Sequence, residues 1–457
     1  MVITAPRVDR ESLLDHYRRV RAATEALAAP LSDEDQCAQS MPDASPSKWH
    51  RAHTTWFFET FVLAPFVNGY QAHDPKYSYL FNSYYEAIGE RHARPERGML
   101  TRPSSPQVGA YRRAVDDAME SLIAERGDSL GRTIEDRIVL GLHHEQQHQE
   151  LLLMDVKHAF SRNVYDPAYR RSSSAPGGAS PTSASREPRP RGTEEASGGG
   201  ARWVEHGGGM VEIGHAGGSF AFDNEGPAHI ALLPPFAVAD RLVTCGEWKA
   251  FIADGGYQRP ELWLSDGWHT ARRDGWEAPL YWERDGTSDG FTMLSLDGRR
   301  AVADDEPVVH VSHYEADAYA HWTGYRLPTE QEWETIAVLQ PTAGNLLDGE
   351  SLATAPLHPT AAPAPNSRGV EMRQCFGDVW EWTGSAYLPY PRFRAAEGAI
   401  GEYNGKFMSN QIVLRGGACV TPRDHVRPTY RNFFYPHQRW MFAGVRLARD
   451  LDFHTNS

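Results

Sequence analysis

Apolar residues recur at intervals of three and four along four segments of the first 160 residues, which is the period of an amphipathic helix. Two of these segments begin with Ser-Pro, at Ser45-Pro46 and Ser105-Pro106. Serine is favoured as an N-cap, and proline is favoured at the first helical position. Four helices of this length, with a long loop between two of them, predict an antiparallel four-helix bundle over residues 1–168.

The composition changes at residue 169. Residues 169–201 are rich in Ser, Gly and Pro and contain almost no large apolar side chains. Such a segment cannot bury enough surface to offset its ordering entropy, so we predict a disordered linker. Over residues 202–457, short apolar runs alternate with Gly, Asp and Pro, and tryptophan is dense. This pattern predicts an irregular α+β domain, with one clear helix after the capping-box pair Thr329 and Glu332.

Bulk properties exclude several classes of protein. The 457 residues carry a formal net charge of -14, which argues against a nucleic-acid partner because the phosphate backbone needs a basic face. No apolar run of about 18 residues occurs, so we expect no membrane span. The first residues contain no apolar signal sequence, and the four cysteines include no CxxC pair. We therefore expect a cytoplasmic protein with reduced, mostly buried thiols.

Residues 144–148 read HEQQH, the spelling of a zinc-protease helix. His144 and His148 are four apart, so they share a helix face and can bind one ion, although a pair of idle surface histidines has the same spacing. A third ligand is available from His50 or His53 on the second helix, and three histidines leave coordination positions open. Gln147 lies on the same face and suggests a contact with substrate or water.

The sequence lacks the extended signature of a zinc protease. Extended zinc-protease motifs place a third histidine six residues after the second, and here Met154 occupies that position. A different metal chemistry is therefore favoured.

Six motifs together carry a family resemblance. They are SKWHRAHTTWFFETF, HHEQQHQELLLMD, RLPTEQEWE, GDVWEWTGSAY, GEYNGKFMSNQIVLRGG and YRNFF. In this order they resemble the ergothioneine-pathway sulfoxide synthases (EgtB). In that family a DinB-like helical bundle is joined to a domain similar to formylglycine-generating enzymes, with a C-type-lectin-like fold. The resemblance covers nearly the whole chain outside the linker.

The resemblance implies a non-haem Fe(II) centre bound by His53, His144 and His148, with His50 as a neighbour. Glu145 and Glu59 remain alternative oxygen donors. The implied reaction joins a thiol to the imidazole of hercynine, the trimethylbetaine of histidine, and consumes O₂ to give a sulfoxide. The metal would hold the three reactants next to one another, so the reaction would not depend on a collision of three separate molecules.

The resemblance also implies a tyrosine that supplies a proton or hydrogen atom during the reaction. One branch of the family is similar in placing its tyrosines on the loop that here contains Tyr84 and Tyr85, and we favour these two. Another branch takes the tyrosine from the C-terminal domain. The local candidates there are Tyr387, Tyr390 and Tyr403.

Substrate contacts follow from the same resemblance. Arg94 and Arg97 resemble the clamp for the carboxylate of the thiol substrate. Asn432 and Phe433 resemble hercynine contacts, with an amide for the carboxylate and an aromatic face for the trimethylammonium. Relatives that use γ-glutamylcysteine carry an aspartate where this chain has Phe434, so cysteine is the expected thiol.

Three other functions stay open on the sequence. A selenium-using relative would join a selenium donor to hercynine. A DinB-type metal-dependent thiol transferase would need no O₂. A non-catalytic binding module would use the tryptophan-rich domain for recognition, with structural histidines. Formylglycine-generating enzymes use a cysteine pair near the end of the domain, but here that region offers Ser409 and only one thiol, Cys419. We therefore expect the C-terminal domain to form the wall and lid of the site.

Overall fold

The structure is a computed structural model. It describes residues 10–126, 129–170, 200–287, 290–348, 355–365 and 371–452. Most of the predicted linker, residues 171–199, lies outside these ranges, so the linker and the domain boundaries stay predictions.

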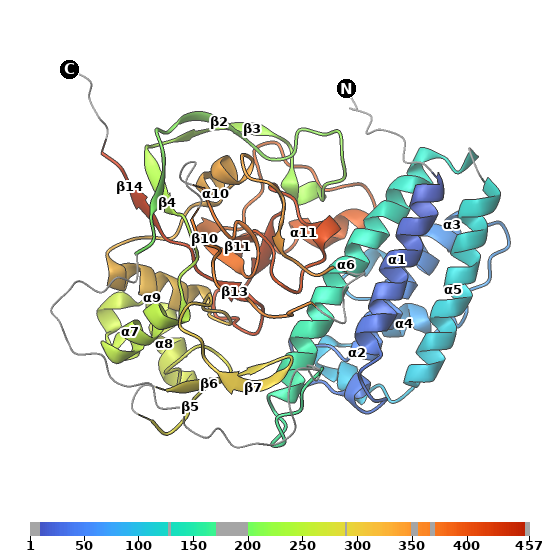
Figure 1. Cartoon of the computed structure of the whole chain (residues 1–457). Helices are drawn as coiled ribbons and strands as arrows, with labels where there is room; N and C mark the ends of the chain where they lie inside the picture. Colours follow the sequence, from blue (N-terminus) through green and yellow to red (C-terminus); the bar gives the residue numbers. More distant parts are fainter. Residues whose placement is uncertain are drawn as a thin grey trace.

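The N-terminal part consists of helices, and Figure 1 shows the longest of them packed side by side. Their bounds are α1 Arg10–Ala28, α2 Ser47–Phe58, α3 Ala64–Phe66, α4 Tyr77–Phe81, α5 Ser105–Arg126 and α6 Arg132–Phe160. A π-helical turn, Glu59–Leu63, joins α2 to α3. The four long helices of the predicted bundle are therefore confirmed as α1, α2, α5 and α6.

The predicted starts of two helices are wrong by one or two residues. α2 begins at Ser47, and the hydroxyl of Ser45 accepts a hydrogen bond from Arg97 and does not cap the helix. α5 begins at Ser105 itself, while Ser104 exchanges capping hydrogen bonds with Gln107. At α2 a tertiary contact engages the serine hydroxyl, and at α5 the neighbouring serine takes the capping role.

The C-terminal part is mixed, as predicted, and it is built from short strands and short helices (Figure 1). The helices are α7 Cys245–Ala253, α8 Ser265–Asp274, α9 His313–Thr323, α10 Glu330–Ala337 and α11 Glu402–Gly405. The strands are β1 Trp203–His206, β2 Gly209–Ile213, β3 His229–Leu233, β4 Phe236–Ala239, β5 Trp282–Arg284, β6 Phe291–Ser295, β7 Gly298–Ala301, β8 Gly344–Asn345, β9 Phe376–Gly377, β10 Trp380–Ala386, β11 Ile412–Arg415, β12 Asn432–Phe434, β13 Ala443–Gly444 and β14 Ala448–Asp450. The capping box of Thr329 and Glu332 at the start of α10 is confirmed.

The sheets are small, and one of them positions the site. β12, β11, β10 and β13 form a four-stranded sheet in that order. The other sheets have the orders β1-β4-β14, β5-β6-β7, β2-β3 and β8-β9. Asn432 on the edge strand β12 pairs with Leu414, and Phe433 pairs with Val413, in antiparallel register. The edge strand thus presents the residues that the sequence assigned to substrate contacts.

α6 belongs to two hydrophobic cores. Its first half, including Ile138 and Leu142, packs with α2 and α5 in the core of the bundle. Its second half, from Leu152 to Val156, packs in one cluster with aromatic residues of the C-terminal part such as Trp380 and Trp440. The two parts of the chain therefore meet along α6, the helix that carries the HEQQH motif.

All four cysteines are free thiols, and three of them are buried, as expected. No helix among the described residues is both long and apolar enough to cross a membrane.

The close approach of α2 to α6 depends on Gly141. A Cβ at this position would lie 2.6 Å from Cε1 of Phe58 and 2.8 Å from Cε1 of Phe57, both of which are buried. Gly109 on α5 is different, because a Cβ there would meet only the ends of Arg113 and Arg51, at 3.4 Å.

We therefore expect Gly141→Ala to lower the free energy of unfolding by about 1–2 kcal/mol, since overpacking outweighs the gain in helix propensity. The matched change Gly109→Ala should leave the stability unchanged or raise it by up to about 1 kcal/mol. Denaturant unfolding of both variants checks this. Equal effects at the two glycines would show that the α2–α6 contact is not tightly packed.

Candidate metal centre

Three buried histidines converge between α2 and α6. The ligand-capable nitrogens of His53, His144 and His148 all lie within 4.8 Å of one another. The Nε2 atoms of His53 and His144 are 3.2 Å apart. Two nitrogens that bind one ion at about 2.1 Å and at a right angle are separated by about 3.0 Å, so His53 and His144 need little movement to bind one metal. Among the described residues, this is the one cluster of three or more such side chains that could hold a metal ion.

Hydrogen bonds at the outer nitrogens set which atoms can face a metal. Nδ1 of His53 donates to the carbonyl oxygen of Phe81 at 2.6 Å, which leaves Nε2 unprotonated. Nδ1 of His148 lies 2.8 Å from Nδ1 of His50, and Nε2 of His50 lies 3.0 Å from the Asp155 carboxylate. With Asp155 accepting from His50, and His50 accepting from His148, Nε2 of His148 also keeps its lone pair.

Asp155 joins three parts of the fold at this point. Besides His50, its carboxylate accepts hydrogen bonds from the backbone N–H of Ser45 at 2.8 Å and from the indole N–H of Trp440 at 3.1 Å. Ser45 precedes α2, Asp155 lies on α6 and Trp440 belongs to the C-terminal part. The orientation of one metal-facing histidine is therefore tied to the packing between the two parts of the chain.

Burial keeps the three imidazoles neutral. Desolvation lowers the pKa of His144 to about 4 and lowers the pKa of His53 and His148 well below the usual value. For His53 and His148, the neighbouring histidines lower the pKa further. Neutral imidazole is the form that binds a metal, so the cluster is ready to bind at neutral pH.

The two carboxylates considered as oxygen donors point elsewhere. Glu145 is fully buried and accepts hydrogen bonds from Arg21, Arg112 and Thr24 at 2.6–2.8 Å. Glu59 accepts from the hydroxyls of Tyr70 and Tyr111 and from the backbone of His73. Both carboxylates are occupied by structural partners, and the structure therefore contradicts their assignment as ligands.

A cavity of about 370 Å³, here called the metal cavity, opens onto His53 and His148. It brings together nearly every residue that the sequence assigned to the site. The predicted residues in its lining are His53, His148, Tyr84, Tyr85, Arg94, Arg97, Gln147, Asn432, Phe433 and Phe434. The neighbour His50 also lines it.

The bundle side of the metal cavity carries two arginines. Arg94 donates to the hydroxyl of Tyr84 at 2.8 Å, and Arg97 donates to the hydroxyls of Ser45 and Ser83. Burial, and then the charge of Arg94, lower the pKa of Arg97 to about 9, so it remains a cation at neutral pH. The buried charge of Arg97 and the half-buried charge of Arg94 lie beside each other and create a site that favours an anionic group.

An aromatic stack links this arginine pair to the metal ligands. The guanidinium carbon of Arg97 lies 3.4 Å from the ring centroid of Trp49, and Trp49 stacks on His53 with centroids 4.6 Å apart. Tyr85 is buried against Trp56 and Phe61. The arginines and the ligands are therefore positioned by the same packed side chains.

The opposite wall comes from β12. The side-chain Oδ1 of Asn432 accepts a hydrogen bond from the backbone N–H of Phe433, so its amide nitrogen remains as the donor end. Phe433 stacks on Tyr387, with centroids 4.1 Å apart, which covers one face of its ring. Phe434 packs edge-on to Trp440.

The C-terminal tyrosines considered as proton donors lie apart from the metal cavity. The hydroxyl of Tyr387 accepts a hydrogen bond from Asn224, and the hydroxyl of Tyr390 contacts Glu330 and Arg415. Within the part of the chain that the structure describes, neither residue lines the cavity. The side chain of Tyr403 lies outside the described part.

Sequence reasoning missed Tyr430. Its hydroxyl accepts a hydrogen bond from Gln147 at 2.8 Å, and the residue lines the metal cavity. The tyrosine belongs to the YRNFF motif, but the motif alone does not show that its hydroxyl reaches a residue 283 positions earlier in the chain.

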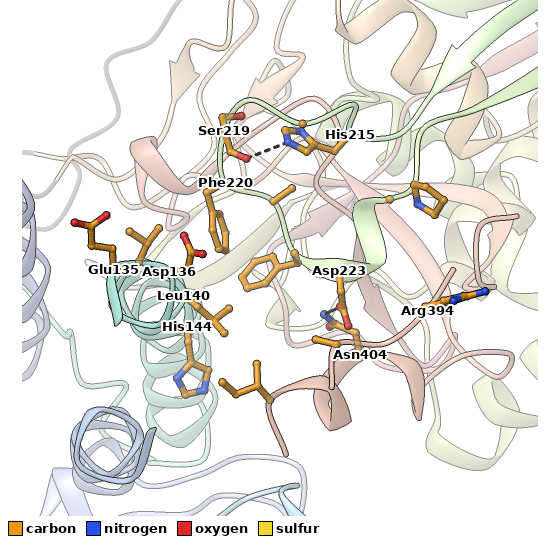
Figure 2. Close-up of a pocket in the computed structure, with 18 of the residues that line it drawn as sticks. Glu135, Asp136, Leu140, His144, His215, Ser219, Phe220, Asp223, Arg394 and Asn404 are labelled. Carbon is orange, nitrogen blue, oxygen red and sulfur yellow. Dashed lines mark hydrogen bonds between the residues drawn. The ribbon is translucent and has the colours of Figure 1, made fainter. Parts of the chain in front are cut away.

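A second and larger cavity, about 1180 Å³, approaches the cluster from the side of His144. Figure 2 shows Leu140 and His144 on α6, with Phe220 and Asp223 of the C-terminal part across this cavity. The two cavities share four lining residues, which are Tyr85, Gln147, Phe222 and Asn404. The histidine cluster is therefore approached from two sides.

Comparison with known proteins agrees with this arrangement. Residues 16–152 match the DinB superfamily, and residues 193–451 match the sulfatase-modifying factor enzyme 1-like domain. The hercynine oxygenase of Mycobacterium tuberculosis is 33% identical over 464 residues, which cover 96% of this chain and 99% of that protein. The hercynine oxygenase of Mycolicibacterium smegmatis is 30% identical over 97% of this chain and 100% of that protein.

A partial match extends to a eukaryote. Ergothioneine biosynthesis protein 1 of Schizosaccharomyces pombe is 29% identical over 243 residues, which cover 50% of this chain and 28% of that protein. The fold and the histidine cluster define an enzyme of the class that joins a DinB-like bundle to a sulfatase-modifying-factor-like domain. Within that class the chain belongs to the hercynine oxygenase (EgtB) family, which confirms the family resemblance of the sequence.

The position of Glu145 gives a test of the ligand assignment. Glu145→Gln should lower the free energy of unfolding by about 3 kcal/mol, because Arg21 and Arg112 stay buried with one counter-charge fewer. The amount of divalent metal bound per folded chain should not change. The matched control is Glu120→Gln, which removes a surface partner of Arg18 and should cost less than about 1 kcal/mol. Loss of the bound metal from folded Glu145→Gln would make Glu145 a ligand.

Proposed function

We propose that the protein is an O₂-dependent, non-haem Fe(II) sulfoxide synthase that joins cysteine to the imidazole of hercynine, giving hercynylcysteine sulfoxide in ergothioneine biosynthesis. One observation carries the proposal. Two of the three clustered, neutral histidines, His53 and His148, line a cavity that has two arginines on one wall and an amide donor on the other. The full-length similarity to hercynine oxygenases supports the choice of substrate.

The donor set suits iron(II). Three imidazole nitrogens without a carboxylate leave the charge of a divalent ion undiminished, and they leave coordination positions for an anionic thiolate and for O₂. When bound, iron supplies the redox chemistry that couples these reactants. The residues around it bind, orient and exclude water.

The reaction balances with one O₂. Forming the C–S bond removes the thiol proton, the proton on the ring carbon and two electrons, and converting the thioether to the sulfoxide removes two more electrons. The four electrons reduce O₂, one oxygen atom stays on sulfur and the other leaves as water. No external reductant is needed.

The two substrates each carry a carboxylate, and the walls of the metal cavity offer a separate site for each. Arg94 and Arg97 would bind the carboxylate of the thiol substrate, since guanidinium groups match its geometry. The amide nitrogen of Asn432 would donate to the carboxylate of hercynine. The exposed part of the Phe433 ring would contact the trimethylammonium group. Both substrates would then be held with their reacting atoms near the histidines.

Tyr84 and Tyr85 are the proposed proton or hydrogen-atom donors. Both line the metal cavity. The oxygen of Tyr84 accepts a hydrogen bond from Arg94, so the proton of its hydroxyl points away from that arginine. Burial of Tyr85 against aromatic rings limits the access of water around it.

Phe434 supports cysteine as the thiol. An aromatic side chain in the cavity wall cannot pair with the ammonium group that γ-glutamylcysteine would add. The choice between thiols is therefore open to direct measurement.

We expect the Fe(II)-loaded protein to consume O₂ when hercynine and cysteine are both present, and to form hercynylcysteine sulfoxide. γ-Glutamylcysteine should be a poorer substrate, with a kcat/KM at least tenfold lower. An oxygen electrode and mass analysis of the products measure both. His53→Ala and His148→Ala should lose stoichiometric iron and all O₂ uptake.

The same experiment separates the alternatives. Turnover of a thiol without O₂ would indicate a thiol transferase. O₂-dependent product formation only with a selenium donor would indicate the selenium-using reaction. Hercynine binding with no turnover under any of these conditions would leave a binding module.

Replacing the two loop tyrosines should change the product and leave metal binding intact. In Tyr84→Phe and Tyr85→Phe, and most strongly in the double variant, we expect oxidised thiol to increase at the expense of the sulfoxide, because the reaction lacks its proton or hydrogen-atom donor. Product ratios by mass analysis check this, with iron content as the control. An unchanged ratio in the double variant would assign the step to another residue.

A further inference from the structure

A chain of hydrogen bonds runs from the metal cavity into the C-terminal part. The amide Nε2 of Gln147 donates to the Tyr430 hydroxyl oxygen at 2.8 Å. The same oxygen lies 3.0 Å from Nε2 of His425, and Nδ1 of His425 lies 3.0 Å from Nδ1 of His143. Gln147 is the half-buried member at the cavity end, and the other three side chains are buried.

The donors and acceptors along this chain have a consistent order. Since Tyr430 accepts from Gln147, its own O–H can donate to Nε2 of His425. His425 then carries its proton on Nδ1 and donates to His143. In this order each hydrogen bond has one donor and one acceptor, and the amide of Gln147 has its nitrogen turned toward Tyr430.

Tyr430 is packed on several sides. Its ring lies edge-on to Trp380, with centroids 5.4 Å apart, and edge-on to His425, with centroids 4.8 Å apart. The guanidinium of Arg427 lies 5.0 Å from the ring centroid. The backbone carbonyl of Tyr430 accepts from Arg415. The hydroxyl is therefore a fixed point against which the amide of Gln147 is oriented.

The orientation determines what Gln147 offers to a ligand. Because Nε2 donates to Tyr430, the carbonyl Oε1 is the end of the amide that is left to contact a ligand. It accepts no hydrogen bond from the described part of the chain. Gln147 lines the metal cavity and precedes the ligand His148 by one residue. A group that binds beside the metal and meets this oxygen must be a hydrogen-bond donor.

We propose that Tyr430 is a positioning residue that holds the carbonyl of Gln147 toward the cavity, where it accepts the ring N–H of hercynine and selects for a ring with such a donor. This inference rests on the proposed function, because it assumes hercynine as the ligand. Without the Tyr430 hydroxyl the amide can turn over and offer either end, and the selection is lost.

The test is equilibrium binding to the Fe(II)-loaded protein without O₂, measured by titration calorimetry. The probes are hercynine and its thiazole analogue, in which sulfur replaces the ring N–H. The wild-type protein should bind hercynine at least tenfold more tightly than the analogue, since the analogue leaves Oε1 without a donor. In Tyr430→Phe this ratio should fall below threefold, with unchanged iron content and unchanged affinity for cysteine.

Two further variants separate positioning from general damage. Tyr319→Phe removes the hydroxyl of a buried tyrosine that stacks on Trp248, away from the cavity, and it should keep the wild-type ratio. His425→Phe keeps an aromatic ring but removes the acceptor for the Tyr430 proton. Tyr430 should then donate to Oε1 of Gln147 and turn Nε2 toward the cavity, which also lowers the ratio.

A double-mutant cycle completes the test. Gln147→Leu should lower the ratio, and adding Tyr430→Phe in that background should change it no further, because Tyr430 acts through Gln147. A wild-type ratio in Tyr430→Phe, or an additive effect in the double variant, would overturn the positioning role while leaving the proposed function intact. Failure of the wild-type protein to bind hercynine would overturn both.

Discussion

The arrangement of the site depends on the hydrogen bonds that the buried carboxylate of Asp155 accepts. The carboxylate accepts hydrogen bonds from the backbone N–H of Ser45, from His50 and from Trp440 of the C-terminal part. Through His50 it determines which nitrogen of His148 faces the cluster. An unpaired carboxylate at this depth would be costly, so the three donors must stay together. The interface between the two parts of the chain and the geometry of the histidines are thus maintained by the same hydrogen bonds.

The charged and the neutral side chains of α6 lie on different faces of the helix, and the neutral histidine face favours the binding of a metal. Glu145 is adjacent in sequence to His144, but it lies on another face of α6 and is neutralised by Arg21 and Arg112. The histidine face holds neutral rings whose pKa values burial has lowered. The carboxylate therefore stabilises the packing of the helices, and the imidazoles keep their lone pairs. A cation at the cluster would meet neutral donors, while the two arginines place positive charge on the wall of the metal cavity.

Periodicity was sufficient to predict the long helices and the shared face of His144 and His148, because these features are local. The choice of His53 over His50, and the roles of Arg94 and Arg97, came from family motifs, since spacing alone left both histidines open. The positions of Asp155 and Tyr430 could not be predicted, because their partners are up to 285 residues away in the sequence. The predicted cap at Ser45 failed for the same reason: its hydroxyl bonds to a distant arginine. Local patterns thus define the elements, and contacts between distant elements complete the site.

The central claim is that three imidazole nitrogens bind one iron ion at the α2–α6 interface. Anomalous diffraction at the iron edge, on crystals grown with Fe(II) and without O₂, tests it most directly. We predict one strong peak about 2.1 Å from the Nε2 atoms of His53, His144 and His148, with no carboxylate in contact. A peak bound by Glu145 or Glu59, a peak on Nδ1 of any of the three rings, or no peak at the cluster would contradict it.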